Sequence, residues 1–125
     1  MILGVGVDIV DLQRFARSLE RTPALTARLF TIRERENTVT SLAGRFAAKE
    51  ALIKAFGGSG TMTWHDMEVV TNELGAPSFV LTGPAAAMAN ARGITSTHVS
   101  ISHDANAAVA FVVAEGSVVA EGGAA

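Results

Sequence analysis

The chain has 125 residues, of which 49% are hydrophobic, and it carries a formal net charge of −2 and no cysteine. This length fits a single domain that can bury a core. The lack of cysteine excludes disulfides, thiolate zinc sites and a cysteine nucleophile, and the acidic balance argues against a general nucleic-acid binder. No apolar run is long enough to span a bilayer and no basic region precedes the first one, so we expect a cytoplasmic chain without a signal peptide. We expect the surplus apolar surface to be covered by subunit contacts.

The first third of the chain predicts one strand and two short helices. Residues Ile2 to Val10 are mainly apolar and β-branched, which predicts a strand buried on both faces. Asp11 is suited to cap a helix that continues to about Arg21. A second helical segment is expected between Pro23 and Phe30.

The middle of the chain predicts one long helix. Thr31 and Glu34 have the spacing of a capping box, which favours a further helical segment there. Residues 37–41 are polar and are expected to form a turn. Good helix formers then run from Leu42 to Phe56, where a cluster of glycines ends the helix.

The remaining segments are predicted to alternate between strands and one helix. We expect a hairpin of strands over 63–71 and 77–82, a helix from 83 to Gly93, and strands over 97–102 and 107–114. The order of elements predicts an α+β fold with helices packed on one face of a largely antiparallel sheet. We assign 1–114 to a single domain and expect 115–125 to form a flexible tail.

Two carboxylates lie at positions where the pattern predicts apolar side chains. Asp8 interrupts the first strand, and Glu50 lies beside the apolar face that Phe46 and Ile53 define on the long helix. A buried carboxylate needs a partner, so Asp8 could meet an arginine or backbone donors, and Glu50 could pair with Lys54 one turn away. Alternatively, the two carboxylates could share a magnesium ion with a phosphate-bearing substrate.

The long helix and the glycine cluster offer further candidates for binding a polyanion. Positive charge could come from Arg45, Lys49 and Lys54. The cluster consists of Gly57, Gly58, Ser59 and Gly60. One glycine after a helix is commonly only a cap, whereas three glycines in four residues also let backbone amides approach a phosphate. Both interpretations remain open at this point.

Two further groups of polar residues have both structural and functional interpretations. Ser102 and His103 end a strand, where a histidine is commonly a turn residue, and their adjacency to an aspartate is no evidence for a catalytic triad. Arg14, Arg17 and Arg21 share one face of the first predicted helix. That face is either solvated surface or a docking site for an acidic partner.

Several segments, taken in order, resemble the holo-acyl-carrier-protein synthase family, the short class of phosphopantetheinyl transferases. They are GVGVDIVDLQRF, LFTIRE, LAGRFAAKEALIKAFG, WHDMEVV, GAPSFVLTGPA and HVSISHD. The pair G-x-D-I-V-x-x-x-R-F and R-F-A-A-K-E-A-x-x-K-A is the most specific part. The resemblance extends from Ile2 to about Ala114.

The resemblance implies the phosphopantetheinyl transferase fold and a defined reaction. This family transfers 4′-phosphopantetheine from coenzyme A to a serine of an acyl carrier protein and releases adenosine 3′,5′-bisphosphate. Asp8 and Glu50 would be magnesium ligands, with Lys54 on phosphate oxygens. Glu50, Glu34 or a metal-bound water could each take the serine proton. The residues expected to contact coenzyme A are Arg45, Lys49, Gly57, Gly58, Ser59, Gly60, Ser102 and His103.

The resemblance also implies two macromolecular partners. The family is trimeric, with coenzyme A between neighbouring chains, so we expect a homotrimer. The acidic carrier protein would dock on Arg14, Arg17 and Arg21. Two other functions are compatible with the residues alone: a non-catalytic oligomeric module that binds a nucleotide or an acidic partner, and a hydrolase that cleaves a pyrophosphate.

Overall fold

The structure, a computed structural model, describes residues 1–118. Its elements are β1 (Ile2–Asp11), α1 (Leu12–Arg21), α2 (Ala24–Leu29), η1 (Glu34–Glu36), α3 (Val39–Ala55), η2 (Trp64–Asp66), β2 (Met67–Thr71), β3 (Pro77–Leu81), α4 (Gly83–Ala91), β4 (Ile94–Asp104) and β5 (Ala107–Gly116). The two η elements are single 3₁₀ turns. The order confirms the predicted α+β fold. Strand β5 continues to Gly116, two residues into the segment predicted as a tail, and residues 119–125 of that segment lie outside the described part.

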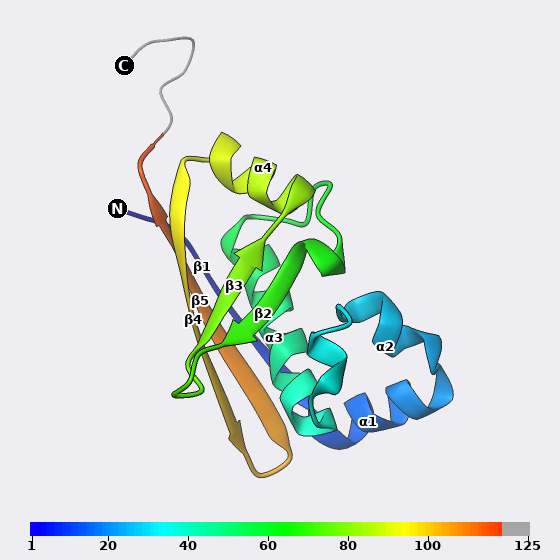
Figure 1. Cartoon of the computed structure of the whole chain (residues 1–125). Helices are drawn as coiled ribbons and strands as arrows, with labels where there is room; N and C mark the ends of the chain where they lie inside the picture. Colours follow the sequence, from blue (N-terminus) through cyan, green and yellow to red (C-terminus); the bar gives the residue numbers. More distant parts are fainter. Residues whose placement is uncertain (119–125) are drawn as a thin grey trace.

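The strands form two antiparallel sheets, which contact each other through β3 and β4 and both contact the long helix α3. The larger sheet has the strand order β1-β5-β4, and the smaller one is the β2-β3 hairpin. Helix α3 packs against β1 and β5, as Figure 1 shows, with α1 and α2 at one end of the molecule and α4 at the other. None of the helices within residues 1–118 is long and apolar enough to cross a membrane.

Small residues let α3 lie very close to β1. A Cβ atom at Gly4 or Gly6 would lie 1.9 Å from the carbonyl oxygen of Ala55 or Ala51, respectively, so no other residue fits at these two strand positions. Side chains alternate along a strand, and Asp8 therefore points to the same face as these glycines. The sequence G-x-G-x-D thus places a carboxylate directly against the central helix.

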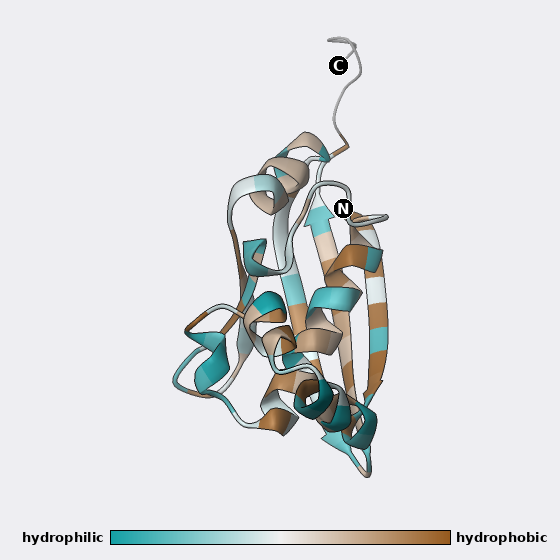
Figure 2. Cartoon of the chain, turned by 90° about the vertical axis from the view of Figure 1, so that its right-hand side faces the viewer, coloured by the Kyte–Doolittle hydropathy of each residue, from teal (hydrophilic) through white to brown (hydrophobic). Residues whose placement is uncertain are grey.

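The prediction that β1 is buried on both faces is wrong for the single chain. Val5, Val7 and Ile9 are 53%, 53% and 68% exposed, and Phe111 on the neighbouring strand β5 is 47% exposed. The helices cover only one face of the larger sheet, so every second residue of β1 faces outward. Figure 2 shows β1 as a largely hydrophobic strand. An apolar surface is therefore left uncovered on the outer face of this sheet.

Several predicted segments differ locally from the structure, and the strand predicted over 97–102 is the longer β4. Helix α3 begins at Val39, earlier than expected, because the Thr38 side chain caps it. The segment Trp64–Asp66 is a 3₁₀ turn closed by a capping box and not part of a strand. The Thr31–Glu34 capping interaction is present, but it is followed by a single turn. Local side-chain caps thus decide the element boundaries that apolar periodicity does not fix.

Candidate active site

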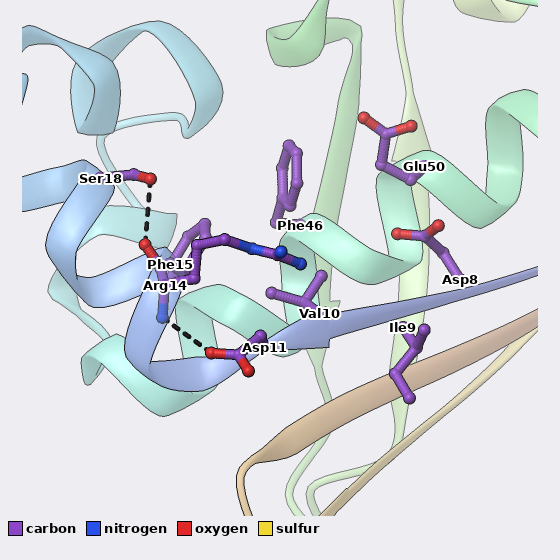
Figure 3. Close-up of a pocket in the computed structure, with 9 residues that line it drawn as sticks. All are labelled: Asp8, Ile9, Val10, Asp11, Arg14, Phe15, Ser18, Phe46 and Glu50. Carbon is purple, nitrogen blue, oxygen red and sulfur yellow. Dashed lines mark hydrogen bonds between the residues drawn. The ribbon is translucent and has the colours of Figure 1, made fainter.

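Asp8 and Glu50 meet in one pocket between β1, α1 and α3. The pocket has a volume of about 320 Å³ and is also lined by Arg14 and Phe46. Figure 3 shows the two carboxylates on the same side of the pocket, with the Arg14 side chain extending toward Phe46. The strand and the helix therefore bring together the two acids that the sequence singled out.

The two carboxylates differ in their partners. Lys54 Nζ donates to Asp8 Oδ1 at 3.1 Å and to the Val7 carbonyl oxygen at 3.0 Å. Among residues 1–118, Glu50 has no ion-pair partner, so the alternative of a Glu50–Lys54 pair is wrong. Burial, and secondly the negative charge of Asp8, raise the pKa of Glu50, and Lys54 offsets part of this rise. The site thus has an excess of negative charge at Glu50.

This donor set fits a magnesium ion. Asp8 and Glu50 supply hard carboxylate oxygens, and their mutual repulsion favours a cation between them. Within the described residues no group of three or more histidine, cysteine or acidic side chains could hold a metal. Magnesium typically uses one or two protein carboxylates and fills its other positions with water and substrate phosphates. Two carboxylates at the edge of an open pocket match that requirement.

Lys49 does not reach the pocket, which corrects its expected role as a coenzyme contact. Its side chain is fully buried, and Nζ donates to the carbonyl oxygens of Leu29 (2.8 Å) and Trp64 (3.0 Å) and to Glu34 Oε1 (2.7 Å). These three bonds use all three ammonium hydrogens. A phosphate contact would require breaking them.

Glu34 is excluded as the base for the carrier serine by the same network. Glu34 is 1% exposed. Its carboxylate accepts hydrogen bonds from Lys49, from the Thr31 N–H at 3.0 Å and from the Val69 N–H at 3.0 Å. A general base must reach the proton that it removes. Of the two acids named for this step, only Glu50 lies at the pocket.

Arg45 and His103 line a second, smaller pocket of about 160 Å³. Arg45 is only 7% exposed; its Nη1 donates to Ser41 Oγ at 2.6 Å, whereas its Nε is buried without a partner. Gly44 makes room for the histidine, because a Cβ there would lie 2.8 Å from His103 Nε2. A buried guanidinium with an unsatisfied N–H is suited to bind an anion. Ser102 points to the opposite face of β4, so only the histidine of this pair joins the pocket.

The glycine cluster is first of all a helix cap. The Gly57 N–H donates to the Lys54 carbonyl and the Gly58 N–H to the Ile53 carbonyl, the two bonds of a Schellman motif. Gly57, Gly58 and Gly60 have φ values of 81°, 140° and 52°. The amides of Gly57 and Gly58 are therefore engaged in the cap, and their expected contacts with coenzyme A stay predictions. The contacts expected for Ser59 and Gly60 stay predictions.

The single chain does not bring all of the predicted site residues together. The pocket of Asp8 and Glu50 shares no residue with the pocket of Arg45 and His103. On α3, Glu50 and Arg45 are five residues apart, so they point about 140° away from each other. The two pockets therefore lie on different sides of this helix.

The arginine face of α1 lies beside the acidic pocket. Arg14, Arg17 and Arg21 are all exposed, and Arg14 also lines the pocket. Phe15 of the same helix stacks on Phe46 at a ring distance of 5.6 Å. Sequence reasoning assigned Phe46 only to the core; its position one turn before Glu50 was the signal that it also forms the pocket wall.

Comparisons with known proteins agree with this arrangement. The 4′-phosphopantetheinyl transferase superfamily model matches residues 4–112. A holo-(acyl-carrier-protein) synthase from Clavibacter michiganensis is 61% identical over 116 residues, which cover 93% of this chain and 98% of that protein. The crystal structure of the synthase from Neisseria meningitidis superposes with a TM-score of 0.84 at 36% identity, covering 92% of this chain and 99% of that chain.

A further solved structure is that of a complex with coenzyme A. This synthase, from Chronobacterium ammoniagenes, superposes with a TM-score of 0.82 at 30% identity and covers 91% of this chain and 97% of that chain. The likeness therefore extends over both sheets and the central helix. The family match over most of the chain and the identity to the Clavibacter synthase lead to one conclusion. This chain belongs to the 4′-phosphopantetheinyl transferase superfamily.

Proposed function

We propose that this chain is a holo-acyl-carrier-protein synthase that transfers 4′-phosphopantetheine from coenzyme A to a serine of an apo acyl carrier protein. The reaction is magnesium-dependent and releases adenosine 3′,5′-bisphosphate. The observation that carries the proposal is the convergence of Asp8 and Glu50 at one pocket, with Glu50 lacking an ion-pair partner among the described residues. Membership of the superfamily supports the reaction class.

In this reaction the serine oxygen forms a bond to the β-phosphorus of coenzyme A, and the bond from that phosphorus to the bridging oxygen breaks. Magnesium bound by Asp8 and Glu50 would neutralise charge on the pyrophosphate oxygens. Lys54, which lies on Asp8, supplies a second positive charge at the same edge. Of the groups named for taking the serine proton, Glu50 and a metal-bound water remain candidates.

We assign the pocket of Arg45 and His103 to the adenosine 3′-phosphate. The partnerless Nε of Arg45 and the width left by Gly44 support this assignment. Because this pocket and the acidic pocket face different sides of α3, one coenzyme molecule would need them from neighbouring chains. The separation of the two pockets therefore supports a shared site between subunits.

We further propose that the neighbouring chains form a homotrimer through the outer face of the larger sheet. Its apolar residues Val5, Val7, Ile9 and Phe111 are about half exposed or more in the single chain. A contiguous apolar surface of this kind is a common mark of a subunit interface. Val7→Glu would place a charge in this apolar surface. We expect this variant to be monomeric in analytical ultracentrifugation and to have lower transfer activity.

The arginine face of α1 is the proposed docking site for the carrier protein. Arg14, Arg17 and Arg21 are exposed on one helix, and Arg14 also lines the pocket of Asp8 and Glu50. Figure 2, which views this end of the molecule, shows hydrophilic residues concentrated there. An acidic carrier bound to this face would hold its serine near the phosphate that is transferred.

Mass spectrometry of an apo carrier protein incubated with coenzyme A and magnesium tests the proposal. We expect the carrier to gain the mass of phosphopantetheine, and Glu50→Gln to reduce the rate by about 10³-fold. Glu73→Gln, an exposed change in the β2-β3 turn, is the matched control and should label at the normal rate.

Two results would replace the proposal by an alternative. Release of adenosine 3′,5′-bisphosphate without any carrier would indicate a hydrolase. Binding of coenzyme A without labelling of any carrier would indicate a non-catalytic module. Full labelling by Glu50→Gln would reject the metal role of that residue.

A further inference from the structure

We propose that Lys49 is a positioning residue for carrier docking, because it fixes the helical arm that carries the arginine face. We define this α1–α2 arm as residues 12–29. The inference rests on the proposed function, since it concerns where the carrier protein binds. It gives Lys49 a role that does not involve contact with coenzyme A.

The ammonium group of Lys49 joins segments that are distant in the sequence. It binds the carbonyl of Leu29 at the end of α2 and the carbonyl of Trp64 in η2. Glu34 receives the third bond and is itself held by the N–H groups of Thr31 and Val69. A buried ion pair with every bond satisfied has one geometry, so it fixes these segments relative to α3.

Within the arm, α1 is anchored by the buried Phe15, whereas α2 has fewer contacts with the body of the protein. Helix α2 has six residues, which is too short to be stable alone, and it packs mainly on α1 and η2. Its last carbonyls are bound by basic side chains: Lys49 on Leu29, Arg35 on Ala27 and Phe30, and His65 on Ala27. Lys49 is the buried member of this clamp, and the other two are exposed.

Aromatic contacts connect the segments bound by Lys49 to helix α1. Phe15 of α1 lies edge-on to Phe30 at a ring distance of 6.3 Å and stacks on Phe46 at 5.6 Å. Trp64 packs on the other side of this row, 5.5 Å from Phe46. Loss of the bonds to Leu29 and Trp64 would therefore move Phe15 and, with it, the neighbouring Arg14 at the pocket.

The test measures the KM for the carrier protein and the affinity for coenzyme A in two variants. Lys49→Met removes the clamp but leaves Glu34 as an uncompensated buried charge, so it is paired with the double variant Lys49→Met, Glu34→Met, which removes both charges. In both variants we expect the KM for the carrier to rise by about tenfold. The affinity for coenzyme A with magnesium, measured by calorimetry without carrier, should stay unchanged. Glu36→Gln, an exposed neighbour of Glu34, is the control.

Two readouts report on the arm without using activity. Trp64 is the only tryptophan, so the emission maximum should shift to longer wavelength in both variants as the ring loses its place. In both variants, hydrogen exchange of residues 24–30 should become faster than in the wild type, whereas exchange of β5 should not change. These measurements still test the clamp if the wild type transfers nothing, which separates failure of this inference from failure of the proposed function.

Three outcomes would overturn the inference. The first is weaker coenzyme binding with an unchanged carrier KM, which would mean that Lys49 contacts the coenzyme. The second is an equal rise in the carrier KM and in the dissociation constant of coenzyme A, which would indicate a general loss of structure. The third is no change in the folded double variant, in KM, emission or exchange.

Discussion

Helix α3 makes two lysine–carboxylate ion pairs that differ in almost every physical respect. Lys49 and Glu34 are 0% and 1% exposed, whereas the side chains of Lys54 and Asp8 are 55% and 20% exposed. The first pair has no room for a ligand, and all of its bonds are satisfied within the chain. The second lies at the edge of an open pocket beside Glu50, which has no ion-pair partner within residues 1–118.

The contrast teaches how one helix serves both structure and chemistry. Lys49 and Lys54 are five residues apart and so point about 140° away from each other. Breaking a buried pair leaves a charge without solvent or partner, and such a pair is therefore fixed. An exposed pair exchanges readily with water, with other ions and with a bound phosphate. The pair near solvent is thus the one that can take part in a reaction.

The largest expected effect is on stability and separates the two lysines. Lys49→Met should lower the free energy of unfolding by about 3–5 kcal/mol, because Glu34 then remains buried and unpaired. The matched change Lys54→Met should cost less than about 1 kcal/mol, since its pair is solvent-screened. Urea denaturation followed by circular dichroism measures both. Equal costs for the two variants would contradict the distinction.

The second effect reverses this order and concerns activity. Lys54→Met should lower kcat by about 10²-fold, because it removes a positive charge from the pyrophosphate edge while the fold stays intact. The rate is measured with saturating carrier and coenzyme, after unfolding curves confirm normal stability. A Lys54→Met enzyme with normal kcat would limit Lys54 to a structural role.

Most of this difference between Lys49 and Lys54 could not be predicted from the sequence. Both are polar residues on a helix with good formers, and the motif presents them alike. The sequence predicted the order of elements, the strand that carries Asp8 and the convergence of Asp8 with Glu50. It did not predict the burial of Lys49, because its partners Leu29, Glu34 and Trp64 come from segments whose packing no local pattern reveals.

Two other features depended on tertiary contacts. The sequence predicted that β1 is buried on both faces, because apolar composition does not tell whether a helix of the same chain or another subunit covers a strand. The pocket of Arg45 and His103 needed the approach of β4 to Gly44, which is a long-range contact. By contrast, the cap at Asp11 and the hairpin turn before Pro77 have local causes and were predicted correctly.

The third effect is on carrier binding and tests the arm that the buried pair holds. Arg14→Glu combined with Arg17→Glu should raise the carrier KM by about tenfold at low salt and reduce its salt dependence. Because Arg14 also lines the pocket of Asp8 and Glu50, the affinity for coenzyme A is compared in Arg17→Glu combined with Arg21→Glu, where it should change little. A carrier KM equal to that of the wild type at all salt concentrations would place the docking site elsewhere.

The smallest effect is on the pH dependence of stability at Glu50. Its pKa is raised in the folded state, so its protonated form stabilises the fold, and this contribution is lost as the pH rises through the folded pKa. Without metal, Glu50→Gln should therefore be more stable than wild type at pH 7. The difference should vanish below the ordinary pKa of 4.5. Thermal unfolding from pH 4 to pH 8 measures it, and a Glu50→Gln protein less stable at pH 7 would contradict the sign.

The most direct measurement of the central claim is calorimetric titration of coenzyme A with and without magnesium. Magnesium should strengthen coenzyme binding to the wild type, and Asp8→Asn and Glu50→Gln should each lose this enhancement while keeping their fold. If both variants bind coenzyme A with the same magnesium dependence as the wild type, the two carboxylates do not hold the ion, and the proposed site is wrong.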